Sequence, residues 1–290
     1  MIPAIDFYRP NTLAELFSKM NELKESGKII AGGTDVIPGF QQNSVRFKKI
    51  NSLVDINQIP ELKTIKETDT TVTIGGAATF SEIMNSELIR KYYPLLVKAV
   101  SGIGSLQIRN RATVVGNFVN NAPCADSVPS LLVYDASIKI ESSGQQRELL
   151  LKDFLLAPYR TQLNSNEVVT KIILPKIANE YHGDFYKLGR RRAVAISRIT
   201  LAVLMKVNDS FIQDVRIASG AVTPIGKRFP DLEKFANGKK ISPALFKELA
   251  QMMGEKIIEE TGIRWSSHYK VPVVQQMFYQ LLRNIHEIKE

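Results

Sequence analysis

Two glycine-centred segments constrain this chain more than any other feature of its sequence. They are Lys28-Ile-Ile-Ala-Gly-Gly-Thr-Asp35 and Arg109-Asn-Arg-Ala-Thr-Val-Val-Gly-Asn117. Each lies in or after an apolar stretch and places glycine near threonine, so backbone N–H groups and a hydroxyl can approach a phosphate without an intervening Cβ. One such turn alone is more often a plain strand end than a phosphate site. Two of them together suit a diphosphate.

Composition places the chain among ordinary globular proteins. Its 290 residues are 44% hydrophobic and 23% charged, enough for one large domain or for two to three smaller ones with their own cores. No run reaches the roughly 18 apolar residues of a membrane-spanning helix. The first residues, Met1 to Asp6, lack the basic and then apolar layout of a secretory signal. We therefore expect a cytoplasmic protein without a membrane span.

The single cysteine, Cys124, excludes an internal disulfide. It also excludes an iron–sulfur cluster or a structural zinc site held by this chain alone, because such centres draw on about four Cys or His ligands. The histidines His182, His268 and His286 show neither ligand spacing nor an acidic partner. We expect no metal site and no catalysis based on histidine.

The formal net charge of +9 raises the question of a nucleic-acid partner. The basic groups are far apart in the sequence, however, as Lys48-Lys49, Arg190 to Arg192 and Lys239-Lys240 show. No RNA-binding or zinc-finger pattern accompanies them. We expect no nucleic-acid partner and interpret the charge as either a solvated surface or a surface for an acidic protein.

Hydrophobic periodicity and turn residues predict an α+β fold in three parts, residues 1–56, 57–177 and 178–290. The predicted helices cover residues 13–20, 80–92, 94–100, 128–134, 243–260 and 269–288. The predicted strands cover residues 28–31, 50–56, 72–74, 137–141, 168–174, 184–188, 198–207 and 215–221. Most of the predicted strands lie between residues 137 and 221, and the two long helices follow them.

The order of several short segments resembles the FAD-binding medium subunit of the molybdenum hydroxylases. That family includes the flavin subunits or domains of xanthine dehydrogenases, carbon monoxide dehydrogenases and aldehyde oxidoreductases. The segments are Ala31-Gly-Gly-Thr-Asp35, Gln107-Ile-Arg-Asn110, Ala112-Thr-Val-Val-Gly-Asn117, Ala122-Pro-Cys-Ala-Asp-Ser127 followed by Leu131 to Ala136, and Phe185-Tyr-Lys-Leu-Gly-Arg-Arg-Arg192. The resemblance covers the whole chain, and its specificity comes from the order and spacing of the segments.

The resemblance implies a set of residues that bind FAD non-covalently. The first diphosphate loop would comprise Lys28, Ile29, Ile30, Ala31, Gly32, Gly33, Thr34 and Asp35, and the second Ala112, Thr113, Val114, Val115, Gly116 and Asn117. Asp126 matches an acidic residue on the ribose of the adenine half, and Asn120 a polar residue that faces the cofactor. Lys187 matches a lysine near the flavin ring, while Ile103 would cover that ring and Ile173 or Leu174 would form its wall.

The resemblance also implies the fold and the function. The fold would be the two-part FAD-binding domain of the vanillyl-alcohol oxidase-like flavoproteins, followed by a C-terminal domain with a three-stranded sheet and helices. The chain would pass electrons through FAD to NAD or another acceptor, with two iron–sulfur clusters in a small partner subunit and the molybdenum cofactor in a large one. Two alternatives stay open: a flavin-free structural or maturation subunit, and a free-standing flavoprotein oxidase.

Two positions have more than one interpretation, and a third has one expected role. Val115 stands where family members usually have a glycine, and its side chain points either into the cofactor site or away from it. Asp126 either contacts the cofactor or caps the helix that begins at Ser127. Trp265 is expected to pack the last helix on its domain.

Overall fold

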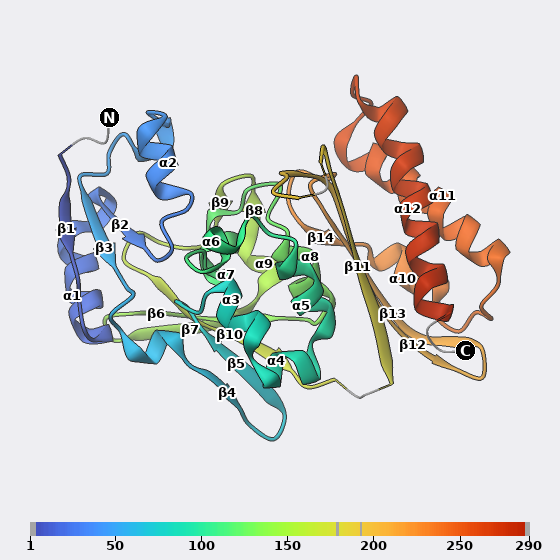
Figure 1. The fold of residues 1–290 in the computed structure, drawn as a ribbon, viewed down its shortest axis with the longest axis horizontal. Helices are drawn as coiled ribbons and strands as arrows, with labels where there is room; N and C mark the ends of the chain where they lie inside the picture. The colour runs from blue at the N-terminus through green and yellow to red at the C-terminus, as the bar shows by residue number, and fades with distance from the viewer. Residues whose placement is uncertain (1–3, 178–179, 192, 288–290) are drawn as a thin grey trace.

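A computed structural model describes residues 4–177, 180–191 and 193–287 of the chain. Arg192, the last residue of one of the motifs quoted above, and the predicted boundary at residue 178 lie outside these ranges. Three groups of strands and helices follow one another along the long axis of the molecule (Figure 1). Each is built around a sheet, and the end of the chain lies on the side opposite its beginning.

The first group is a small parallel sheet in the order β1-β3-β2. Helix α1 lies between β1 and β2 along the chain. Thr12 caps it by accepting a hydrogen bond from the N–H of Glu15. Its buried residues Leu16 and Met20 lie one helical turn apart, so they face the sheet together. The elements are β1 (Asp6–Tyr8), α1 (Leu13–Leu23), η1 (Lys24–Ser26), β2 (Gly27–Ile30), α2 (Val36–Gln41), η2 (Val45–Phe47) and β3 (Ser52–Asp55).

The second group has a five-stranded sheet in the order β4-β5-β10-β6-β7, with neighbouring strands antiparallel. Its strands are β4 (Ile65–Glu67), β5 (Thr71–Gly75), β6 (Ser137–Ser142), β7 (Gln145–Leu150) and β10 (Val168–Pro175), with a separate pair formed by β8 (Leu155–Ala157) and β9 (Arg160–Thr161). The alternation of buried and partly exposed residues along β6 and β10 shows that one face of this sheet meets the core.

The helices of the second group are η3 (Pro60–Lys63), α3 (Phe80–Asn85), α4 (Glu87–Tyr92), α5 (Pro94–Ser101), α6 (Leu106–Arg109), α7 (Val114–Asn120), α8 (Ser127–Val133) and α9 (Leu151–Phe154). All but η3 and α6 contribute buried residues to the main core against that sheet. Tyr93 and Tyr134 lie edge to face in this core, with ring centroids 5.1 Å apart. The hydroxyl of Tyr93 donates to the carbonyl of Leu174, so this buried polar group is satisfied.

The third group is a sheet in the order β11-β12-β13-β14 with helices on one face. Its elements are β11 (Tyr181–Gly189), β12 (Ser197–Asn208), β13 (Phe211–Gly220), β14 (Lys227–Arg228), α10 (Pro230–Ala236), α11 (Pro243–Thr261) and α12 (Ser267–Glu287). The predicted three-stranded sheet is confirmed by its three long strands, and the two-residue strand β14 adds an edge.

Strand β12 is buried on both faces and joins two cores. Leu201 and Val203 point to the side covered by α10, α11 and α12, whereas Ala202 and Leu204 belong to the main core of the second group. Because side chains alternate along a strand, each face of this sheet serves a different core. The continuous apolar run of β12 therefore attaches the C-terminal group to the rest of the molecule.

Two expectations from the sequence are wrong. The helix predicted over residues 80–92 is divided into α3 and α4 at Ser86, whose hydroxyl accepts from the N–H of Ile89 and so begins a new helix. Trp265 does not pack against its domain, because 84% of its surface is exposed in the turn between α11 and α12. None of the described helices is long and apolar enough to cross a membrane.

Candidate functional site

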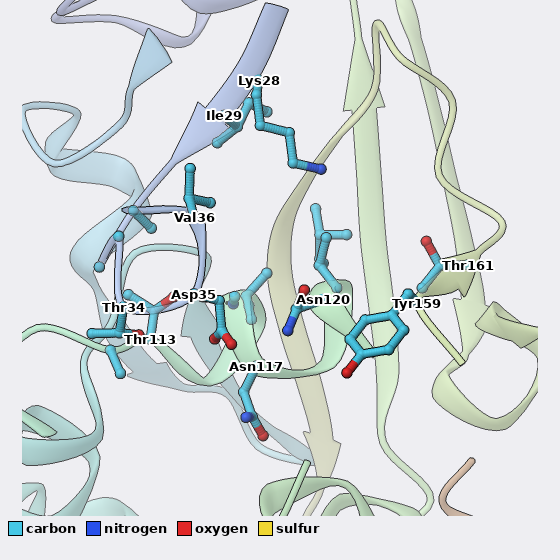
Figure 2. A pocket seen from close by; sticks show the side chains of 18 of the residues that line it. Lys28, Ile29, Thr34, Asp35, Val36, Thr113, Asn117, Asn120, Tyr159 and Thr161 are labelled. Atoms are coloured by element: carbon cyan, nitrogen blue, oxygen red, sulfur yellow. Dashed lines mark hydrogen bonds between the residues drawn. The ribbon is translucent and has the colours of Figure 1, made fainter. Parts of the chain in front are cut away.

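A cavity of about 880 Å³ lies where the three groups of elements meet. This volume is at the upper end of the range of about 300–1,000 Å³ for small-molecule sites. Residues of the first loop lie on one side of it, and Asn120, Tyr159 and Thr161 on the other (Figure 2). The C-terminal group contributes Lys187 and Ser197, at the facing ends of β11 and β12.

Both predicted loops line this cavity. The predicted residues on its wall are Lys28, Ile29, Ala31, Gly32, Gly33, Thr34, Asp35, Ile103, Ala112, Thr113, Val115, Gly116, Asn117, Asn120, Asp126 and Lys187. Ile30 and Val114 lie between these residues in the chain, but their side chains are buried in neighbouring cores. The tertiary structure thus brings together segments that are separate in the sequence.

Ile173 was predicted to line the cofactor site, but it lies elsewhere in the structure. It lies in the middle of the five-stranded sheet, where it pairs with Thr73 on β5 and Ser137 on β6, and it is not on the cavity wall. Leu174, the alternative, is fully buried in the main core. At the other end of β10, Val168 and Val169 line the cavity instead.

The two glycine loops touch through their main chains. A Cβ on Gly32 would collide with the carbonyl oxygen of Arg111 and lie 2.7 Å from the Cα of Ala112. No rotation of a side chain relieves such a contact, so glycine is required here for the close approach of the two backbones. Gly33 has a φ of +72°, in the left-handed region that favours glycine. Gly32 therefore allows the two loops to come into contact, and Gly33 allows the left-handed turn of the first loop.

The first loop supplies backbone donors to the cavity. Within the described ranges, the N–H groups of Gly33, Thr34 and Asp35 donate to no protein acceptor. In the second loop the N–H of Gly116 donates to the hydroxyl of Thr113, 3.0 Å away, as the cap of α7, whereas the N–H groups of Thr113 and Val115 donate to no protein acceptor in those ranges. A diphosphate in the cavity would therefore find unpaired backbone donors on both loops.

Val115 forms part of the wall without filling the cavity. Its side chain belongs to the main core and is only 6% exposed. Gly116, the next residue, is exposed to the cavity, and a Cβ there would meet only Thr113 Oγ1, at 2.8 Å. Glycine at position 116 therefore leaves this part of the wall open to the cavity.

Asp126 and Lys187 form a largely buried ion pair on the cavity wall. Lys187 Nζ lies 2.7 Å from Asp126 Oδ2 and also donates to the carbonyl of Gly102, 2.8 Å away. Burial raises the pKa of Asp126, although Lys187 opposes that rise through its charge and hydrogen bond. Asp126 Oδ1 and Ser197 Oγ are both buried without a geometrically good hydrogen-bond partner in the described structure, although Ser197 is near enough to lower the pKa of Asp126. Asp126 Oδ1 can therefore accept a hydrogen bond from a donor on a ligand.

These contacts decide between the two roles that the sequence left open for Asp126. The residue precedes α8, but its side chain makes no capping hydrogen bond and its backbone is already helical. The capping interpretation is therefore wrong. The ion pair also places Asp126 and Lys187 at one point of the cavity, whereas the resemblance assigned them to opposite halves of an extended dinucleotide. We therefore treat them as one group that faces a single part of the cofactor.

Cations gather at the other side of the cavity. Burial lowers the pKa of Lys28, and the nearby charge of Arg46 lowers it further. Burial raises the pKa of Asp35, against the effect of Arg46. In the described ranges neither Lys28 nor Arg46 forms an ion pair with a carboxylate. Their positive charge therefore acts on whatever occupies the cavity, and it favours an anion.

Sequence reasoning missed Arg46, Tyr159 and Ser197 on this wall. Arg46 follows the first loop by eleven residues, in a stretch without a phosphate-binding pattern. Tyr159 lies in Ala157-Pro-Tyr-Arg-Thr161, where the proline indicates only a turn. The left-handed φ of Tyr159, +60°, is visible only in the structure.

The fold and the site together suit a ligand with a diphosphate, in a cavity where the three groups of elements meet. Comparison with known families agrees. Residues 3–177 match the family model described as FAD binding domain in molybdopterin dehydrogenase, and residues 184–285 match the CO dehydrogenase flavoprotein C-terminal domain. The chain belongs to this family of FAD-binding subunits, and its cofactor is FAD.

Relatives align over nearly their whole length. The chain is 29% identical to the nicotinate dehydrogenase FAD-subunit of Eubacterium barkeri, covering 97% of this chain and 95% of that one. It is 28% identical to the glyceraldehyde dehydrogenase medium chain of Sulfolobus acidocaldarius, covering 98% and 99%. The structure of carbon monoxide dehydrogenase from Hydrogenophaga pseudoflava matches with a TM-score of 0.90 at 27% identity, over 99% of both chains.

Proposed function

We propose that this chain is the FAD-carrying electron-transfer subunit of a molybdenum hydroxylase complex. Electrons would arrive from iron–sulfur clusters in a small partner subunit, with substrate hydroxylated at a molybdenum cofactor in a large one, and would leave through FAD to NAD or another acceptor. The observation that carries the proposal is the cavity formed by two glycine loops in main-chain contact, with Asp126 and Lys187 on its wall.

The residues fit FAD in three respects. The free N–H groups of the first loop and the cations Lys28 and Arg46 suit its diphosphate. The unpartnered Asp126 Oδ1 suits one of its hydroxyls. Lys187 holds an ammonium on the wall, where a cation would favour negative charge on the reduced flavin ring. Bound FAD supplies the redox chemistry, while these side chains bind and orient it.

An electron relay also agrees with what the chain contains. Its single cysteine cannot hold an iron–sulfur cluster, and the described residues include no group of three or more His, Cys, Asp or Glu side chains arranged for a metal. Electrons must therefore enter through a docked partner, for which the net charge of +9 suits an acidic surface. A cytoplasmic location remains part of this proposal.

The relatives leave the substrate open, because their names refer to nicotinate, glyceraldehyde and carbon monoxide. The decisive experiment therefore uses a panel of candidate substrates. The purified chain is loaded with FAD and mixed anaerobically with candidate hydroxylase substrates, before and after the two partner subunits are added. We expect the flavin absorbance to bleach only with the partners present.

Two other results would contradict the proposal. Bleaching by a substrate without partners would favour the free-standing oxidase. A purified chain that shows no flavin spectrum and takes up no added FAD would favour the flavin-free structural subunit. The buried position of Val115 removes the main sequence argument for that second alternative.

A further inference from the structure

Arg46 connects the first and second groups of elements across the cavity. It lies on η2, and its Nη1 donates to Asn120 Oδ1 at the end of α7, over 2.7 Å. Its guanidinium carbon also lies 4.2 Å from the centroid of the Tyr159 ring, within the range of a cation–π contact. One side chain of the first group thus binds two side chains of the second.

Tyr159 is held in place for this contact by a strained loop. Its φ of +60° is unfavourable for any residue with a Cβ. Its N–H donates to the carbonyl of Asn121, 2.8 Å away, and Asn121 Nδ2 donates in turn to the carbonyls of Ala157 and Arg160. Strain that persists because its surroundings fix it is typical of functional positions.

All three residues line the cavity that holds the cofactor site. Tyr159 is 48% exposed, so its ring stands at the opening rather than in the core. In Figure 2 its ring and Asn120 lie side by side, across from the residues of the first loop. Lys28, which forms no ion pair within the described ranges, is half-buried, whereas Arg46 is exposed at the surface. Arg46 is therefore the more accessible of these two cations.

We propose that Arg46, Asn120 and Tyr159 form a clasp that retains FAD by closing the cavity between the two groups of elements. The clasp rests on the binding of FAD in this cavity. A cofactor that leaves past this opening requires the two groups to separate, and separation breaks both the charged hydrogen bond and the cation–π contact. The clasp consequently acts mainly on the rate of FAD dissociation.

The test measures FAD dissociation from the full chain by the recovery of flavin fluorescence after dilution. We expect Arg46→Gln to increase the dissociation rate about tenfold or more, the factor given by loss of one hydrogen bond to a charged group. Tyr159→Leu removes only the cation–π contact and should increase the rate about two- to fivefold. The double variant should add little to Arg46→Gln, because loss of the guanidinium already removes both contacts. Tyr159→Phe keeps the ring and should behave like the unchanged protein.

Lys48→Gln is the matched control. Lys48 is exposed two residues after Arg46 and does not line the cavity, so the substitution removes the same charge from the same segment. Equal dissociation rates for Arg46→Gln and Lys48→Gln would overturn the clasp. Full retention by Arg46→Lys would overturn it as well, because charge alone would then suffice.

Two measurements separate failure of the clasp from other failures. Thermal unfolding of the FAD-free variants shows whether each still folds, and Asn120→Ala provides a second route to opening the clasp without changing charge. If the unchanged chain takes up no FAD, the cofactor assignment itself fails. If it binds FAD and all clasp variants release it at the control rate, only the clasp is refuted.

Discussion

Removing the unpartnered carboxylate oxygen at position 126 tests the cofactor site most directly. Asp126 is 5% exposed, and its Oδ2 is occupied by Lys187, so its Oδ1 is the atom left for a hydroxyl of FAD. One hydrogen bond to a charged group is worth about 1.5–3 kcal/mol. Asp126→Asn should therefore weaken FAD binding by about 10- to 150-fold at 1.4 kcal/mol per factor of ten.

The assay is a titration of the FAD-free protein that follows the change of flavin fluorescence. Asp184→Asn is the matched control, because Asp184 also pairs with a lysine, Lys98, between α5 and β11, and does not line the cavity. It should cost stability without affecting FAD. A titration with ADP then shows which half of the cofactor Asp126 contacts: weaker ADP binding indicates the adenosine half, and unchanged ADP binding the flavin half.

The reasoning is refuted if Asp126→Asn lowers the melting temperature as much as Asp184→Asn does and leaves FAD affinity within threefold of the unchanged protein. In that case the carboxylate would serve only the ion pair with Lys187. The unpartnered Asp126 Oδ1 would then not be a contact to FAD.

Three further predictions follow from the same structure. Gly33→Ala and Gly144→Ala place a Cβ at similar backbone angles, φ +72° and +74°, and each should lower the free energy of unfolding by about 1–2 kcal/mol. Calorimetry should show weaker FAD binding only for Gly33→Ala. FAD affinity should fall as the pH drops through the raised pKa of Asp126, because the protonated carboxyl loses its acceptor charge; if Asp126→Asn keeps the same pH dependence, the acidic group is another one. Arg228→Met should lower the free energy of unfolding by about 3 kcal/mol, because it leaves Glu233 buried without its partner; a melting temperature as unchanged as that of a surface-lysine variant would contradict this.

The sequence determined the class of fold through patterns that act over short distances. Apolar patterning predicted β6, β10 and β12 close to their observed bounds, whereas the start of β13 was predicted four residues too late; Gly262 correctly separated the last two long helices. The order and spacing of several short segments along the chain identified the family. Such patterns report the period of an element and the chemistry of a turn, and both are local properties of the chain.

Local patterns were weaker at element breaks and at surfaces. Ser86 begins a new helix inside a stretch of helical periodicity, because its hydroxyl competes for a backbone N–H. Trp265 was expected to pack the last helix on its domain, yet its side chain is exposed. Ile173, which the resemblance assigned to the cofactor site, lies four residues beyond Val169, the last residue of β10 on the cavity.

The tertiary structure alone decided how the site is assembled. Asp126 and Lys187 are 61 residues apart in the sequence, and Arg46 and Asn120 are 74 apart, yet each pair is joined by a hydrogen bond of 2.7 Å. Gly32 approaches Arg111 through main-chain atoms, a contact that neither loop's sequence predicts. The sequence by itself determined that two loops exist and what they suit chemically. Their distance from each other, and the side chains that close the cavity around them, follow from how three sheets pack, which no local pattern encodes.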